Sequence, residues 1–596
     1  MFDVLIKGGT VVDGTGGAPR VADVGLRNGR IAAIGQLSEG AQRVVDADGA
    51  LVAPGWVDAH THYDGQVTWD DKLEGSAANG VTTVVMGNCG VGFAPVPKGG
   101  AAALIDLMEG VEDIPGTALF EGMPWGAWET FPEYLQFLDG RRYSLDVGAQ
   151  LAHGALRYYV MGERAISRDA ARAEDVQAMA AITEAAVRAG ALGFSTSRII
   201  GHKSMSGHSV PGTFAPEAEL LAIAQAMRAG GGAVLQAIPA SAIGVMDGME
   251  AEHSALLDEV HRLGRISRST GQTVVFSTFQ TNDAPQHWRS VLAATEAENR
   301  GGAHLHPMVA PRAGTVLTTL RGYHRFMQRP TYMKFEGLPH EQLVAALRQP
   351  DVKAAILAEQ DVRDPRPGAM ENLLPAVFEA ALPLTFELND PIDYEPLPEN
   401  SLHARALREG RTPLEYLYDF LLGDDGKAVG VYLGANYIEG NLDACREMLL
   451  DRNTVTGLSD AGAHVNFICD MSIPTFNLTH WVRDRSRGER LPIELLVAKC
   501  TAVPARLFGL HDRGTLEIGK RADVNVIDLA QLKIHRPVLL HDLPAGGSRF
   551  IQPSTGYLAT LVNGEITRVR DQDTGARPGR VARPVRDGQV QFAAGS

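Results

Sequence analysis

The chain has 596 residues, enough for a large hydrophobic core and more than one folding unit. Hydrophobic residues make up 45% of it and charged residues 21%, which is close to the average for soluble globular proteins. The net charge of −16 argues against a protein that binds nucleic acid or an anionic membrane, because either partner would need a basic face.

The sequence carries no sign of export. Its first residues, MFDVLIKGG, lack the basic segment and the longer apolar run of a signal peptide. No apolar stretch approaches the ~20 residues that span a bilayer. The four cysteines, Cys89, Cys445, Cys469 and Cys500, form no CxxC pair, which suits a reducing compartment. We therefore expect a cytoplasmic protein.

The two ends of the chain share a sequence pattern that is typical of short β-strands. Short β-like runs broken by glycine fill the first fifty residues, for example at 3–6 and 31–34. Similar runs return at 523–527 and 561–566. Residues 1–53 and 512–596 could therefore pair into one small β domain.

Between these ends, short apolar runs alternate with segments of helical period, which is typical of βα units around a parallel sheet. The helical segments include 170–189 and 217–228. The predicted strands are 56–60, 82–87, 146–153, 191–195, 233–236, 273–277, 303–308 and 456–460. Eight such strands predict an α/β fold of the (β/α)8 TIM-barrel class over residues 54–511.

One connection in this predicted barrel is unusually long. About 140 residues, roughly 311–453, separate the seventh predicted strand from the eighth, and a single crossover does not need that length. We expect an inserted lid or subdomain there.

Two histidines, His60 and His62, stand at the end of the first predicted barrel strand. Residues i and i+2 of a strand point to the same face, so both imidazoles would project into the barrel mouth, where barrel active sites lie. Imidazole is a preferred ligand for zinc-like ions. The HxH spacing alone is a weak signal, because His304-Leu305-His306 repeats it.

Two further donors follow other strands. Asp460 lies in the sequence GLSDAG at the end of the eighth predicted strand, where a carboxylate can bind a metal and accept a proton from water. The purely structural alternative for Asp460 is a turn or helix-capping residue. Cys89 ends the second strand in MGNCG and offers a soft thiolate ligand. Most lone cysteines are inert and buried, and we interpret the other three in that way.

These motifs resemble the amidohydrolase superfamily, and specifically its D-aminoacylase-like (N-acyl-D-amino-acid deacylase) branch. The resemblance lies in APGWVDAHTH (53–62), GVTTVVMGNCG (80–90), Ser459-Asp460 and GTLEIGKRAD (514–523), and it covers nearly the whole chain. It implies a composite β-sandwich built from both termini beside a metal-dependent barrel. It also implies metal ligation by His60, His62, Cys89 and Asp460, with the cysteine in place of the carboxylated lysine of other relatives.

The chain departs from the family at the ends of strands 5 and 6, where the family has histidine ligands. Here the corresponding residues are Gln236 and the run Ser277-Thr278-Phe279-Gln280. We therefore predict one metal ion, most simply Zn2+, although other divalent metals are not excluded. A replacement ligand could come from one of four other histidines, His202, His208, His304 and His306.

A second departure concerns the substrate. The family resemblance implies a lysine after strand 6 and an arginine after strand 8 that hold the substrate carboxylate, and this chain has neither there. Lys203 and His202 after strand 4 are the nearest substrate-binding candidates, together with Gln236 and His153. A solvated loop lysine and a hydrogen-bonded supporting histidine are the plain alternatives.

The sequence thus predicts a metal-dependent hydrolase of amide (C–N) bonds other than peptide bonds, with Asp460 as general base and acid. The small-molecule substrate, its chirality and the oligomeric state stay open, and a homo-oligomer is compatible with the chain. Ester, lactone or cyclic-amide hydrolysis is an alternative, as is isomerisation or decarboxylation at one metal. A non-catalytic scaffold, as in dihydropyrimidinase-related proteins, is disfavoured because the four donor residues are present.

Overall fold

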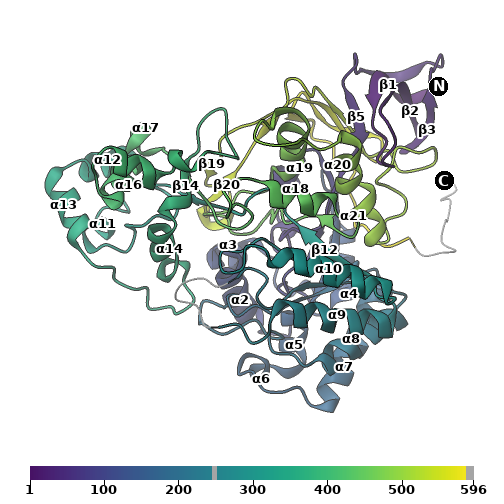
Figure 1. Cartoon of the computed structure of the whole chain (residues 1–596). Coiled ribbons are helices and arrows are strands. Elements are labelled where there is room, and N and C mark those ends of the chain that lie inside the picture. Colours follow the sequence, from purple (N-terminus) through teal and green to yellow (C-terminus); the bar gives the residue numbers. More distant parts are fainter. Residues whose placement is uncertain (245–250, 586–596) are drawn as a thin grey trace.

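The structure is a computed structural model that describes residues 1–244 and 251–585 (Figure 1). Residues 586–596 of the predicted C-terminal segment 512–596 lie outside the described residues. Within the described part, no helix is both long and apolar enough to cross a membrane.

A sheet of eight parallel strands occupies the centre, in the order β16-β12-β11-β10-β9-β8-β7-β6. All residues of these strands except His306 are buried, because helices cover the outer face of the sheet and side chains from the strands pack together on its inner face. The strands are β6 (Trp56–Asp58), β7 (Val81–Met86), β8 (Asp146–Ala152), β9 (Gly193–Ser197), β10 (Val234–Ile238), β11 (Val274–Ser277), β12 (Leu305–Val309) and β16 (Val455–Thr456). The predicted set of eight strands is confirmed.

The sheet curls so that its two edge strands approach each other. Just beyond β6 and β16, Thr61 and Ala461 form a parallel bridge, and the His62 N–H donates to the Ala461 carbonyl at 2.8 Å. This arrangement is consistent with the predicted (β/α)8 barrel.

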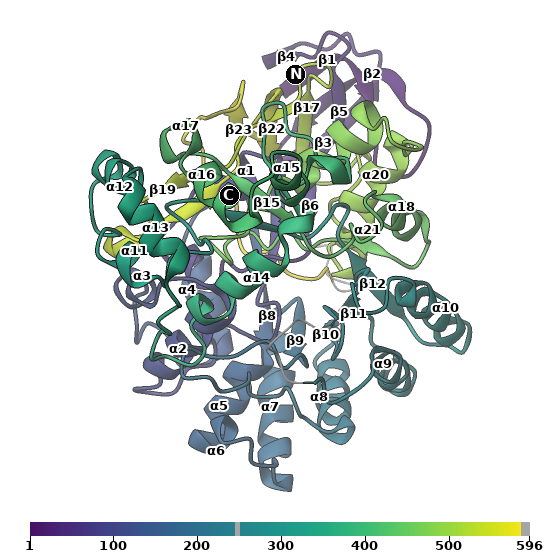
Figure 2. The ribbon, with the colours of Figure 1, turned by 60° about the vertical axis from the view of Figure 1, so that its left-hand side comes forward.

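Helices flank the strands on the outside. Figure 2 shows α7, α8, α9 and α10 side by side around β8 to β12. The predicted helices 170–189 and 217–228 correspond to α7 and α8. Their bounds are α5 (His153–Met161), α7 (Ala173–Ala189), α8 (Glu217–Ala229), α9 (Leu256–Thr270) and α10 (His287–Arg300), and the last barrel helices are α18 (Asp443–Leu450), α20 (Ile493–Cys500) and α21 (Ala502–Leu507).

A second sheet joins strands from both ends of the chain, in the order β24-β23-β22-β17-β5-β1-β2-β3, with β4 also paired to β1. Its N-terminal strands are β1 (Phe2–Val11), β2 (Arg20–Arg27), β3 (Arg30–Gly35), β4 (Ala41–Asp46) and β5 (Leu51–Pro54). Its C-terminal strands are β17 (Val524–Ile527), β22 (Tyr557–Val562), β23 (Glu565–Val569) and β24 (Gln572–Asp573). The two halves meet where β17 pairs antiparallel with β5. Treating this sheet as a separate domain stays a prediction.

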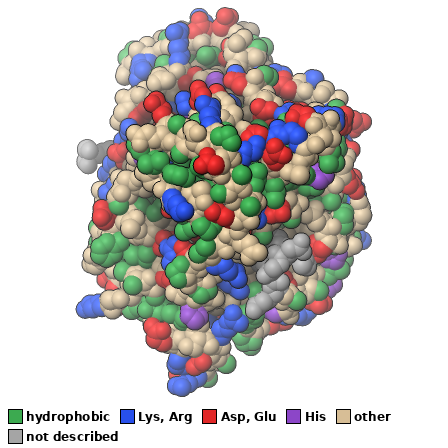
Figure 3. All heavy atoms as spheres, turned by 90° about the vertical axis from the view of Figure 1, so that its left-hand side faces the viewer, with side chains coloured by type: hydrophobic (Ala, Val, Ile, Leu, Met, Phe, Trp, Pro, Cys, Tyr) green, Lys and Arg blue, Asp and Glu red, His purple; other side chains and the backbone are tan. Residues whose placement is uncertain are grey.

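Most of the long connection between β12 and β16, residues 311–453, forms a lobe beside the barrel (Figure 1), which we call the insertion, whereas its last helix, α18, packs against the barrel strand β12. It contains a three-stranded antiparallel sheet of β13 (Thr315–Thr318), β15 (Gly430–Leu433) and β14 (Thr385–Glu387). Its helices are α11 (Pro330–Met333), α12 (His340–Leu347), α13 (Pro350–Ala358), α14 (Leu374–Ala380), α15 (Leu402–Arg408), α16 (Pro413–Leu421) and α17 (Gly423–Gly426). On the face that carries this lobe, charged side chains of both signs alternate with hydrophobic ones (Figure 3).

Candidate metal centre

The four predicted donor residues follow three barrel strands. His60 and His62 come just after β6, Cys89 comes after β7, and Asp460 comes after β16. These are the carboxyl ends of the strands, where enzymes of this fold place their active sites. Strands β6 and β16 end two or more residues before the predicted ends at 60 and 460, because the backbone turns out of the sheet there, and Asp460 itself has a φ of 47°.

Local hydrogen bonds hold these strand ends against each other. The Ser459 hydroxyl donates to a carboxylate oxygen of Asp58 and to the His60 carbonyl, which ties the end of β16 to the end of β6. The Asn88 side chain donates to the Thr61 carbonyl at 3.0 Å, which ties β6 to β7. The donor groups are therefore fixed by buried backbone contacts.

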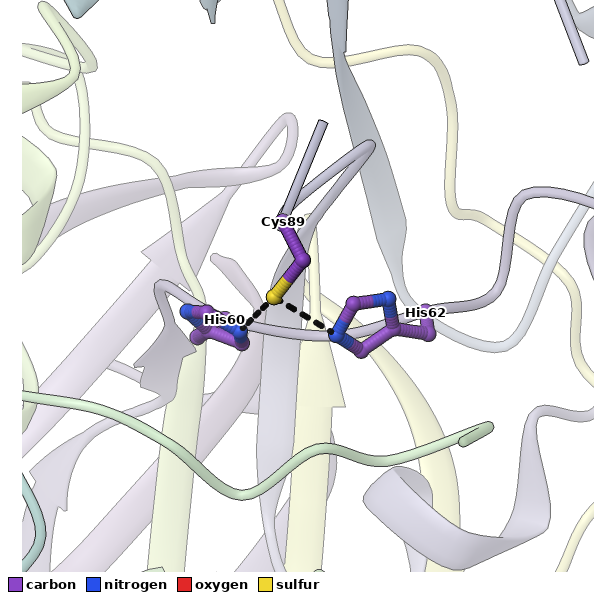
Figure 4. Close-up of side chains that lie close together, drawn as sticks. All are labelled: His60, His62 and Cys89. Carbon is purple, nitrogen blue, oxygen red and sulfur yellow. Dashed lines mark hydrogen bonds between the residues drawn. The ribbon is translucent and has the colours of Figure 1, made fainter. Parts of the chain in front are cut away.

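Cys89 occupies a left-handed backbone conformation, with a φ of 55°. This conformation is costly for a residue other than glycine and is maintained only where surrounding structure demands it. The Cys89 N–H donates to Oε1 of Gln236 at 3.2 Å. The strained turn aims the sulfur between the two imidazole rings (Figure 4).

Donor atoms of His60, His62 and Cys89 lie within 4.8 Å of one another, and Asp460 approaches the two imidazoles from outside this group. Cys89 Sγ lies 3.3 Å from Nε2 of His60 and 3.7 Å from Nε2 of His62. Oδ1 of Asp460 lies 3.2 Å from Nε2 of His60 and 3.8 Å from Nε2 of His62. Ligands bound at zinc distances stand about 3.3–3.8 Å apart in a tetrahedron, so His60, His62 and Cys89 fit such an ion, and Asp460 lies beside the two histidines.

The chemical state of these groups also fits a cation. Burial lowers the pKa of His60 to about 3 and that of His62 well below its usual range, so both rings are neutral and can donate lone pairs. Burial raises the pKa of the Cys89 thiol well above its usual range. A thiolate there requires a nearby positive charge, which a bound metal ion would provide.

Asp460 differs from the other three groups because it faces open space. Its side chain is 23% exposed, against 1% for each histidine. Burial, followed by the nearby Asp470 and Asp58 carboxylates, raises its pKa to about 8. This carboxyl group can therefore exchange a proton near neutral pH.

Behind the cluster, Glu112 joins two histidines. Its Oε1 lies 3.3 Å from Nδ1 of His62 and its Oε2 lies 3.4 Å from Nε2 of His464, and the Glu112 side chain is 1% exposed. A carboxylate on the far nitrogen of a ligating imidazole commonly orients that ring. Glu112 ends helix α2 (Ala101–Glu112), and His464 lies in the loop after β16.

A cavity of about 330 Å3 includes Asp460, His202 and His464 in its lining. This size is within the usual range for small-molecule sites. The insertion supplies much of the apolar wall: Val316, Met370, Leu373, Leu374, Val377 and Tyr432. The insertion therefore shapes the space in front of the donor cluster.

The other predicted site residues lie at different places. His202 lines the cavity, with its Nδ1 at 2.9 Å from the Ser197 hydroxyl. Lys203 is not among the described residues that line the cavity. Gln236 lies behind Cys89, and its side-chain Oε1 accepts a hydrogen bond from the Cys89 backbone N–H. His153 is fully buried between Thr196 and Glu219, each 2.9 Å from one of its ring nitrogens.

Of the four histidines considered as replacement ligands, His202 is the one that lines this cavity; His208, His304 and His306 do not. His304 precedes β12 and His306 lies near its start, at the opposite end of the strand from the site, and His306 Nδ1 is 3.0 Å from the Asn453 carbonyl. His208 lines a different pocket, beside Ser204 and Tyr158.

Sequence reasoning missed Glu112 and His464. Glu112 is twenty-three residues beyond Cys89 and ends a helix, so no strand-end motif pointed to it. His464 follows Asp460 by four residues, and that short spacing was the one available signal.

Comparison with known proteins agrees with this arrangement. The N-acyl-D-glutamate deacylase of Alcaligenes xylosoxydans xylosoxydans is 30% identical over 536 residues, which cover 88% of this chain and 87% of that one. An uncharacterized protein of Mycobacterium tuberculosis is 28% identical over 614 residues, covering 99% and 94%.

Among solved structures, the N-acyl-D-glutamate deacylase of Bordetella bronchiseptica, complexed with zinc and a phosphonate mimic of the tetrahedral intermediate, superposes with a TM-score of 0.61 at 26% identity. The match covers 98% of this chain and 99% of that one. The model of the Amidohydrolase family matches residues 43–568. With that match spanning the whole central sheet and all four donor residues, the chain belongs to the amidohydrolase family, in its D-aminoacylase-like branch.

Proposed function

We propose that this protein is a metal-dependent hydrolase that cleaves an amide bond other than a peptide bond, at a single metal ion. The observation that carries the proposal is that donor atoms of His60, His62 and Cys89 lie within 4.8 Å of one another, with Asp460 Oδ1 at 3.2 and 3.8 Å from the two imidazoles and in the wall of a cavity. Relatives named as N-acyl-D-amino-acid deacylases support the amide as the bond that is cleaved.

His60, His62 and Cys89 would hold the ion, with Asp460 at its open side. We propose one ion because neither Gln236, within the fifth strand β10, nor Thr278, just after the sixth strand β11, offers an imidazole. Imidazole and thiolate together suit zinc. When bound, the ion supplies Lewis acidity, which polarises a carbonyl and lowers the pKa of a water.

Asp460 performs the proton transfers in this proposal. Its carboxylate accepts a proton from the water that attacks the amide carbon, and its carboxylic acid then donates that proton to the leaving nitrogen. The amide and water yield a carboxylic acid and an amine, so the proton returns and the side chain is regenerated. The partly exposed position of Asp460 in the cavity wall suits a group that must both accept and release a proton.

The decisive variant is Asp460→Asn in the zinc-loaded protein, assayed against N-acyl-D- and N-acyl-L-amino acids, simple amides, cyclic amides and lactones. General acid–base catalysis contributes about 100- to 10,000-fold, so we expect kcat to fall by at least about 100-fold while zinc, measured by elemental analysis, remains bound. Asp425→Asn, at an 85% exposed side chain of the insertion, is the control and should leave kcat unchanged.

Each alternative has its own outcome in this experiment. Unchanged turnover in Asp460→Asn would remove the proposed role of that residue. Turnover of lactones alone would favour an esterase. No bound zinc and no turnover of the wild-type protein would favour a non-catalytic scaffold.

A further inference from the structure

The cavity in front of the donor cluster has an apolar wall on both sides. The insertion contributes the six residues named above, and the barrel side adds Ile199, Phe279, Leu458 and Ile468. Apolar walls favour apolar ligand groups, because the transfer of such groups out of water provides binding free energy.

The titratable groups that line this cavity are acids and histidines. Asp460, Asp470, His202 and His464 are present, and no lysine or arginine is among the lining residues that the structure describes. The sequence of residues 245–250, VMDGME, also contains no basic residue. Burial lowers the pKa of both histidines, to about 3 for His202 and about 4 for His464, so they are neutral at pH 7. Away from the proposed metal ion, a ligand carboxylate would therefore lie beside Asp460 and Asp470 without a lysine or arginine to pair with it.

One buried cation lies behind the cavity wall, and it already has a partner. Arg312 Nη2 donates to Oδ1 of Asp470 at 2.7 Å and to the Cys469 carbonyl at 3.0 Å. Its guanidinium also lies 4.7 Å from the centre of the Tyr394 ring. A substrate carboxylate could use Arg312 only by displacing Asp470 from a buried ion pair, which is strongly unfavourable.

We infer that this cavity selects amides whose group beside the scissile bond is uncharged and apolar, and that it rejects free amino-acid carboxylates. This inference rests on the proposed function, because it assigns the substrate class of the same site. The cost of placing an unpaired carboxylate in an apolar space beside two acids produces the selection.

The test measures binding and turnover separately, on a matched pair of ligands. The pair is N-hexanoyl-phenylalanine and N-hexanoyl-phenylalaninamide, in both enantiomers, at pH 8 with the zinc-loaded protein. These ligands differ only in carboxylate against carboxamide. We expect the carboxamide of the preferred enantiomer to bind at least about tenfold more tightly in calorimetry.

A substitution in the cavity wall should change the preference for the carboxamide over the carboxylate. Val316 is a half-buried cavity residue on strand β13, where a lysine can place its ammonium group at the wall. Val316→Lys should reduce the preference for the carboxamide at least about threefold, since it supplies the missing cation, whereas Val316→Met should keep it. Thermal unfolding checks that both variants fold.

The outcomes separate this inference from the proposed function. Equal or tighter binding of the carboxylate by the wild-type protein would overturn the inference, as would binding of neither ligand or a preference that Val316→Lys leaves unchanged. If the carboxamide binds as expected but no amide is hydrolysed, the proposed function fails while the assignment of the cavity stands.

Discussion

Glu112 is a buried acid with a histidine on each carboxylate oxygen, and it links the donor cluster to the cavity wall. Replacement by glutamine keeps the size of the side chain but exchanges one carboxyl oxygen for an amide nitrogen, so the side chain can no longer present an oxygen to both His62 and His464. Loss of such a partner typically weakens metal binding by about 10- to 100-fold. We expect Glu112→Gln to release zinc to a chelator at correspondingly lower chelator concentration.

Helix α2 offers a matched control in Glu109, which is 30% exposed and lies one turn before Glu112. Glu109→Gln should retain the zinc affinity of the wild-type protein. Equal zinc affinity in Glu112→Gln and Glu109→Gln would show that the buried carboxylate does not support His62.

Individual site residues could be predicted from the sequence where a short local motif marks them. His60, His62 and Cys89 could be singled out because they end predicted strands, and their donor atoms lie within 4.8 Å of one another in the structure. Their role as ligands stays a prediction. Glu112 could not be found in the same way, because only the tertiary packing of α2 brings it behind His62.

Among the larger elements, the insertion is attached to the barrel through a buried ion pair. Glu395, between β14 and α15, accepts hydrogen bonds from Arg485 at 3.0 and 3.1 Å, and both side chains are at most 3% exposed. Removing one partner of a buried pair costs about 3–5 kcal/mol when the other charge is left alone; Arg485 keeps Asp443 at 2.7 Å, so a smaller loss is expected here. Glu395→Gln should therefore lower the thermal midpoint of unfolding measured by circular dichroism.

The insertion has a half-exposed pair for comparison, Glu387 and Arg405, whose side chains are 38% and 26% exposed. Exposed pairs contribute little to stability, about 0–1 kcal/mol. Glu387→Gln should leave the midpoint nearly unchanged, and equal midpoints for Glu387→Gln and Glu395→Gln would contradict the attachment role of Glu395.

The same pair gives a pH dependence with a defined sign. Burial opposes ionisation of Glu395, but hydrogen bonds from His480 and Arg485 outweigh it and lower its pKa from 4.5 to about 2. A lowered pKa in the folded state stabilises the protein fully above pH 4.5, and this stabilisation disappears as the pH falls toward 2. The difference in midpoint between wild type and Glu395→Gln should be constant from pH 6 to 8 and shrink below pH 4.5; a difference that grows in acid would refute it.

Helices and strands could be predicted where each one shows a hydrophobic pattern within its own segment of sequence. Short runs rich in apolar and β-branched residues marked strands such as β7 and β10, and helical periodicity marked α7 and α8. The internal architecture of the insertion could not be predicted. Its small sheet pairs β13 with β15 across more than a hundred residues, and that pairing leaves no mark in local sequence.

For the molecule as a whole, the chain ends and the barrel are interlocked. Strand β17 pairs with β5, which leads directly into β6, and Arg513 donates to a carboxylate oxygen of Asp146 on β8 at 2.6 Å. The similar texture of the two termini predicted that they could pair. The register of that pairing depends on long-range packing, which the sequence alone does not reveal.

A bound ion would act on this whole assembly, because its proposed ligands come from the first, second and last strands of the central sheet. A ligand that binds only the folded state stabilises it by about 2.7 kcal/mol at a hundred times its dissociation constant. Zinc added to chelator-treated protein should therefore raise the thermal midpoint with increasing concentration.

Cys89→Ser should need much more zinc for the same rise, since it loses the thiolate. Cys445→Ser, at a buried cysteine in α18, should respond like wild type. The ligand assignment would be wrong if the two cysteine variants responded alike, because the folded barrel would then gain nothing from a thiolate at position 89.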